Sequence, residues 1–162
     1  MNWSEALSAA IEVGIAIVGF SGIIAAIGRR SVGDWTATDQ LLLRILLTSS
    51  SAAIVFAFLP FIILDTGLDP VLFWKIGSGA QFAWILGIVL FRNNEAGKIG
   101  ASLKAYSPWI SFFIFLPVLV LLLVNMSVLG APWPYVIGVC LSLFTAVRTF
   151  VRLLLDSWRP GE

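Results

Sequence analysis

Apolar residues fall in five long runs along the chain, and short polar stretches separate the runs. The runs predict helices over residues 6–28, 37–64, 70–92, 109–129 and 134–157. A helix needs roughly 20 mostly apolar residues to cross about 30 Å of hydrocarbon, and each run reaches that length. Because backbone groups inside hydrocarbon must be satisfied internally, such runs form helices. The pattern predicts an all-α polytopic membrane protein, with a single transmembrane domain over residues 1–162 and a bundle of five helices.

Several polar and proline residues mark where these helices begin or bend. Thr36 with Asp39 three residues later resembles a capping box, although Asp replaces the usual Glu or Gln. Asp69 stands directly before Pro70, which is typical of a helix start. Pro60 and Pro117 lie inside predicted helices, where each removes a backbone hydrogen bond.

Positive charge alternates between the connections and predicts the orientation. Arg29 and Arg30 follow the first run, and Lys98 and Lys104 lie between the third and fourth, whereas the opposite connections are acidic or neutral. Cytoplasmic segments collect Lys and Arg, so we expect the N-terminus outside and the C-terminus inside. Termini on opposite sides of the membrane require an odd number of crossings, which agrees with five runs. The compact length and short connections favour a prokaryotic cytoplasmic (inner) membrane.

Composition excludes several classes of function. Hydrophobic residues make up 59% and charged residues 12% of the chain, whereas a soluble domain carries about a quarter charged residues. A net charge of +1 argues against nucleic acid as a partner. Histidine is absent, and the single cysteine, Cys140, lies inside an apolar run. We therefore expect no catalytic set, no metal site and no cofactor.

Small residues recur at helical spacing in the first and third runs and predict close helix packing. These positions are Ala10, Gly14, Gly22 and Ala26 in the first run, and Gly77, Ala80 and Gly87 in the third. We expect the first three helices to form the interior and the bulkier fourth and fifth to face lipid. The small-residue faces either hold the monomer together or also mediate self-association.

Polar residues inside the predicted spans form an outer group of candidates. Glu12 and Lys75 have similar expected depths and could form an ion pair. Alternatively, Glu12 faces a water-filled vestibule and binds a cation. Gln81 could continue such a path, and Thr48 and Ser51 belong to a slim, polar stretch of the second helix. Glu12, Gln81, Thr48 and Ser51 together are the candidate pore or ion site.

Three arginines form an inner group, each predicted near the cytoplasmic side. Arg44 lies in the second run, and Arg148 and Arg152 share a face of the fifth. They either extend towards lipid phosphates and pair with aspartates such as Asp39, or form a site for an anion or a lipid headgroup. Asn125 is expected to form hydrogen bonds at the outer interface.

Two functions remain after these exclusions. The first is a homo-oligomeric channel or pore for small ions, in which a repeated charge gives selectivity. The second is a non-catalytic scaffold or accessory subunit of a larger membrane complex, with another membrane protein as its partner. Both involve membrane lipids. A secondary transporter is disfavoured because five helices do not divide into equal halves.

Overall fold

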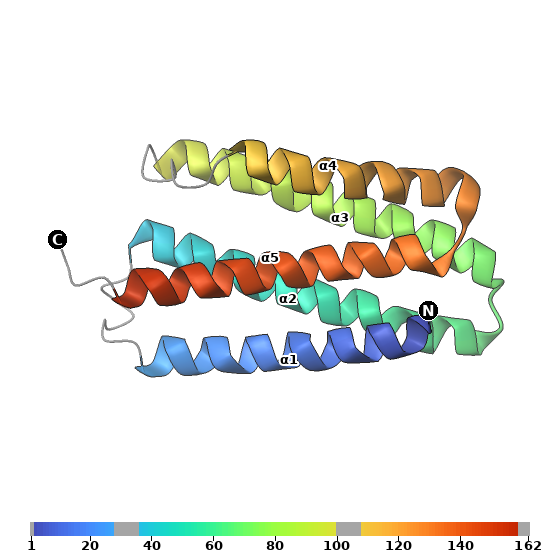
Figure 1. The fold of residues 1–162 in the computed structure, drawn as a ribbon, viewed down its shortest axis with the longest axis horizontal. Coiled ribbons are helices and arrows are strands. Elements are labelled where there is room, and N and C mark those ends of the chain that lie inside the picture. The colour runs from blue at the N-terminus through green and yellow to red at the C-terminus, as the bar shows by residue number, and fades with distance from the viewer. Residues whose placement is uncertain (1, 28–35, 100–107, 159–162) are drawn as a thin grey trace.

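The chain folds into an elongated bundle of helices that run along a common direction (Figure 1). The computed structural model describes residues 2–27, 36–99 and 108–158, and no β-strand occurs among them. The α-helices are α1 (Trp3–Ile27), α2 (Ala37–Ile63), α3 (Pro70–Ile99), α4 (Pro108–Val124) and α5 (Pro132–Trp158). A 3₁₀ turn, η2 (Leu64–Thr66), extends α2, and a π-helical turn, η4 (Asn125–Leu129), extends α4. The all-helical prediction is confirmed.

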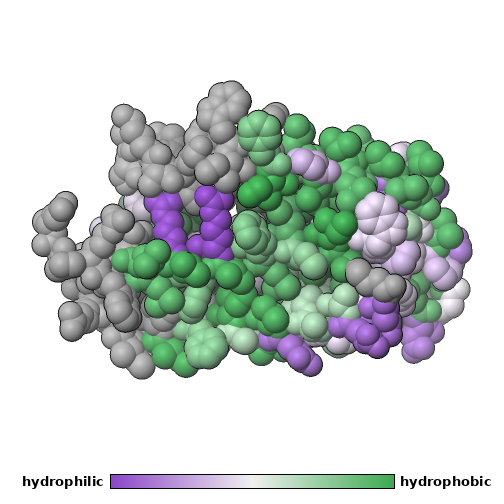
Figure 2. Space-filling model, in the orientation of Figure 1, coloured by the Kyte–Doolittle hydropathy of each residue, from purple (hydrophilic) through white to green (hydrophobic). Residues whose placement is uncertain are grey.

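Four of the described helices are long and apolar enough to cross a membrane, namely those containing Trp3–Ile23, Ala37–Thr66, Pro70–Phe91 and Pro132–Leu155. The remaining apolar segment, Phe113–Leu129, is shorter. Apolar side chains cover the middle of the face shown in Figure 2, and hydrophilic side chains gather towards the two ends of the bundle. Helix α1 begins and α5 ends at opposite ends of the bundle (Figure 1).

Local hydrogen bonds explain where α2 and α3 begin. The Thr36 side chain accepts from the backbone N–H of Asp39 at 3.2 Å, and the Asp39 carboxylate accepts from the backbone N–H of Thr36 at 3.1 Å. The predicted capping box is thus confirmed. The Asp69 carboxylate accepts from the N–H of Leu72 at 3.2 Å, just before α3. Each of these contacts satisfies backbone donors that the first helical turn leaves free.

Helix α3 continues to Ile99, beyond the predicted end at residue 92. The apolar run stops near residue 92, and hydrophobicity alone predicts the end of the helix there. The following residues, Asn94 to Lys98 among them, are polar or small but include good helix formers such as Glu95 and Ala96. Helix propensity therefore carries α3 past the point where hydrophobicity ends.

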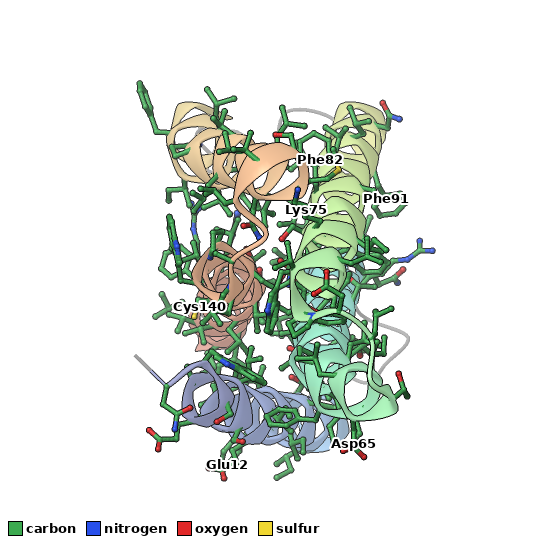
Figure 3. The ribbon with its side chains drawn as sticks, turned by 90° about the vertical axis from the view of Figure 1, so that its right-hand side faces the viewer. Glu12, Asp65, Lys75, Phe82, Phe91 and Cys140 are labelled. Carbon is green, nitrogen blue, oxygen red and sulfur yellow. The ribbon has the colours of Figure 1, made fainter. Side chains whose placement is uncertain are left out.

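The helices are arranged in three layers. Helices α2 and α5 form the middle layer, α1 covers them on one side, and α3 and α4 lie on the other (Figures 1 and 3). Helix α2 makes its most extensive contacts with α5. The expectation that α5 faces lipid while the first three helices form the interior is therefore wrong.

A slim face of hydroxyl side chains allows α5 to occupy the centre. Ser142, Thr145 and Thr149 are all buried. Their hydroxyls donate to backbone carbonyls of their own helix, at 3.3, 2.8 and 2.7 Å respectively. Because these side chains satisfy their own hydrogen bonds, they behave as small packing residues. Sequence hydrophobicity alone does not distinguish such a face from a lipid-facing one.

Candidate functional site

Glu12 points away from the bundle at the outer surface of α1 (Figure 3). The buried face of this helix carries Leu7, Ala10, Gly14, Ile17 and Ser21. Glu12 is two residues from both Ala10 and Gly14, which places it roughly 200° from each at 100° per residue. The carboxylate is exposed, and it makes no hydrogen bond or ion pair with any residue that the structure describes.

The structure does not bring Glu12 and Lys75 together. Lys75 extends from α3 on the far side of the bundle from Glu12 (Figure 3), and its Nζ donates to the carbonyl oxygen of Ser127 at 3.5 Å. The outer ion pair was inferred from similar depth. Depth along the helices does not fix the direction in which a side chain points, and α2 and α5 separate these two residues.

One line of exposed residues on α1 runs through Glu12, with the exposed apolar side chains of Val13, Ile15 and Phe20 beside it. We call this line the outer seam, and it comprises Ala9, Glu12, Ala16, Gly19 and Ile23, all of which are exposed. Their spacing alternates between three and four residues, so they lie in one line along the helix. A Cβ placed on Gly19 would meet no atom within 4 Å. The outer seam therefore presents three small residues, one carboxylate and, at its far end, the larger Ile23 to the surroundings of the bundle.

The other candidate pore residues lie elsewhere. Thr48 and Ser51 are exposed on α2, and the Thr48 hydroxyl donates to the Arg44 carbonyl at 2.7 Å. Gln81 is buried in the interior, with 2% of its surface exposed. The structure therefore does not join Glu12, Gln81 and the Thr48–Ser51 stretch into one path through a single copy.

The inner arginines are held by neighbouring groups. The Arg44 guanidinium lies over the ring of Phe91 in α3, with 5.0 Å between its Cζ and the ring centroid, a cation–π contact. Arg148 and Arg152 are half-buried one turn apart on α5, and both interact with neighbours. A lipid-headgroup or anion site at these residues stays a prediction.

The small residues predicted to mediate packing divide into two sets. Ala10, Gly14 and Gly77 are buried. A Cβ on Gly14 would lie 2.7 Å from Cγ1 of Ile54, and one on Gly77 would lie 2.7 Å from Cε2 of Tyr135. These glycines permit close approach of helices, as predicted.

The second set faces outward. Gly22, Ala80 and Gly87 are exposed, and a Cβ on either glycine would meet no atom within 4 Å. The side chain of Ala26 lies outside the described part of the chain. A step of four residues turns the helix by roughly 400°, so a line of residues four apart drifts by about 40° per step. That drift carries Gly22 away from the buried face that Ala10 and Gly14 share.

A buried hydrogen-bond cluster that the sequence pattern does not predict joins α3 to the end of α4. The Asn125 Nδ2 donates to the Ser78 hydroxyl at 2.7 Å and to the Ala131 carbonyl at 3.0 Å. Its Oδ1 accepts from the Ala131 N–H at 2.8 Å. Asn125 forms hydrogen bonds as expected, and it is completely buried within the protein. A lone Asn shortly before Gly130, which has a φ of +58°, is the sequence signal for this closed turn.

The fold places the chain among helical proteins whose helices are long and apolar enough to cross a membrane. Comparison with known proteins found no matching family model, no matching curated protein and no matching solved structure. Function is therefore inferred from the residues of this chain, and above all from Glu12.

Proposed function

We propose that the protein is a five-span integral membrane protein that assembles from identical copies into a pore for small cations, with the outer seam of α1 at the contact between copies. The charge pattern of the connections supports an outside N-terminus and an inside C-terminus, and the compact length and short connections favour a prokaryotic cytoplasmic membrane. The observation that carries the proposal is Glu12, an outward-facing carboxylate within a span, with no partner among the described residues.

The energetic cost of Glu12 supports a partner or water at this surface. An ionisable side chain at the centre of a span costs about 2.5–3.5 kcal/mol on insertion scales, so it is placed towards protein or water rather than lipid tails. Lys75, the partner predicted within the same chain, is engaged elsewhere. An aqueous pathway beside α1 removes this cost by hydrating the carboxylate.

Identical copies supply such a pathway more simply than an unrelated partner does. Copies inserted in the same orientation place Glu12 at the same depth, so a symmetric assembly creates a ring of carboxylates. A ring of Glu side chains favours cations. The neighbouring Ala9, Ala16 and Gly19 allow α1 helices to approach closely.

Ion flux from liposomes that contain the purified protein tests this function. We expect wild-type protein to pass cations in preference to anions, and Glu12→Gln to lose that preference because the ring becomes neutral. Glu5→Gln is the matched control: Glu5 lies on the same helix, but it is exposed at the first turn and accepts from Asn2 Nδ2 at 2.8 Å.

Two results would count against the pore. A selectivity equally altered in both variants would indicate a general surface-charge effect. An absence of flux in the wild type, across voltage and ionic conditions, would favour the scaffold function. In that case Glu12 would be expected to meet a Lys or Arg on the helix of another membrane protein.

A further inference from the structure

Gln81 is a buried amide at the contact between α3 and α5. Only 2% of its surface is exposed, and neither its Nε2 nor its Oε1 has a hydrogen-bond partner among the residues that the structure describes. Ser78, one turn earlier on the same helix, is fully buried but is bonded to Asn125. Gln81 therefore differs from its polar neighbour in having both ends of its amide unsatisfied.

The amide lies against the backbone of α5 at Gly138. A Cβ placed on Gly138 would overlap Oε1 of Gln81 and lie 3.1 Å from its Cδ. The glycine thus leaves the space that the amide occupies. The hydroxyl that comes next on this face of α5, that of Ser142, donates to the carbonyl of Gly138. Leu122, whose Cδ2 would lie 3.3 Å from the same Cβ position, is apolar. The surroundings supply a cradle for the amide but no complete set of partners.

We infer that Gln81 holds internal water at the α3–α5 contact. An amide needs an acceptor for its N–H groups and a donor for its oxygen, and water is the smallest species that offers both. A cation would satisfy only Oε1 and an anion only Nε2. A lipid headgroup does not reach the site, because Gln81 lies near the middle of the span Pro70–Phe91. Buried waters typically satisfy polar groups of this kind, with about three hydrogen bonds each.

This inference is independent of the proposed pore, since Gln81 lies between α3 and α5 and not on the outer seam of α1. It assigns Gln81 a hydrated interior site within one copy. The hydration would persist in a protein that conducts no ions, so failure of one proposal leaves the other standing.

Water-to-amide polarisation transfer by solid-state NMR tests the inference on the full-length protein in bilayers of deuterated lipid. The chain contains two glutamines, Gln40 and Gln81, so glutamine labelled with ¹⁵N at the side chain gives two amide signals. Gln40 is exposed at the start of α2 and serves as the internal control. We expect Gln81 to receive polarisation from water, with hydrogen exchange slower than that of Gln40.

Three variants complete the experiment. Gln81→Met removes the signal and assigns it, with Gln40→Met as the matched control. Gly138→Ala places a methyl group where Oε1 lies and so displaces the amide. We expect it to reduce the polarisation transfer to Gln81 and to leave the transfer to Gln40 unchanged. If Gln81 receives no polarisation from water at mixing times that saturate Gln40, the amide is dry and the inference is overturned. The Gln81→Met assignment keeps this result decisive even if Gly138→Ala fails to fold.

Discussion

At the scale of single residues, a tyrosine compensates for a proline on another helix. Pro60 lacks the N–H that would donate to the carbonyl of Phe56, four residues earlier. The Tyr135 hydroxyl of α5 donates to that same carbonyl at 2.6 Å. Tyr135 is completely buried, and its ring contacts Phe73 and Trp74. The proline therefore creates an acceptor, and the tyrosine uses it to join α2 to α5.

Tyr135→Phe is expected to destabilise the protein by about 1–2 kcal/mol, because it leaves a buried carbonyl without a donor. Pro60→Ala restores a backbone N–H at residue 60. In the Pro60→Ala background we therefore expect Tyr135→Phe to cost less than half as much. Unfolding equilibria of the four proteins in mixed micelles give this double-mutant cycle. Equal costs in the two backgrounds would show that the hydroxyl is not compensating for the proline.

At the scale of elements, the sequence predicts the helices well and their facing directions poorly. Apolar runs and caps such as Thr36 locate helix starts because both signals are local. Which side of a helix is buried depends on partners distant in sequence, and uniformly apolar helices carry little directional information. Glycines show the difference: Gly77 and Gly87 appear equivalent in sequence, yet only Gly77 is covered, by Tyr135.

The same reason explains which parts of the candidate site were predictable. Glu12 was recognised because a carboxylate in an apolar run is conspicuous at any orientation. The direction in which Glu12 points, and hence the absence of an ion pair with Lys75, follows only from the fold. The roles of Asn125 and Tyr135 depend on contacts of their side chains with Ser78 and Phe56, 47 and 79 residues away. No local pattern contains such contacts.

Substitution of the two α3 glycines tests this difference in packing. Gly77→Leu is expected to destabilise by about 1–3 kcal/mol, because its Cβ alone would lie 2.7 Å from the Tyr135 ring. Gly87→Leu should cost little, since nothing lies within 4 Å of a Cβ there. Both changes raise the helix propensity of α3 equally, so the difference between them isolates packing. Thermal unfolding followed by circular dichroism measures it, and similar losses in the two variants would contradict the assigned orientation of α3.

At the scale of the whole molecule, α1 alone forms one of the two outer layers and contacts the rest of the bundle through one face. Its buried face packs on α2 and α5. The outer seam stays exposed, and its Glu12 points away from the bundle (Figure 3). Gly14 allows the close approach on the inner side, against Ile54, and Gly19 offers the same possibility on the outer side. A layer with small residues on both faces is suited to lie between the bundle and a neighbouring copy.

Cysteine cross-linking in membranes tests that arrangement directly. The native Cys140 is exposed on α5, so Cys140→Ser provides a background without thiols. In that background Ala16→Cys, on the outer seam, is expected to give disulfide-linked dimers on mild oxidation. A disulfide requires Cα atoms within about 7 Å, so only residues at the contact should react efficiently.

Ile15→Cys is the matched control, since Ile15 is exposed at the same depth but is turned by about 100° from Ala16. We expect it to cross-link much less. Equal reaction at both positions would indicate random collision, and no reaction at Ala16 would exclude a close α1–α1 contact. Ala16→Cys combined with Glu12→Gln then separates assembly from conduction: if the carboxylate serves ion selectivity alone, the neutral variant should still form the dimer while its cation preference is lost.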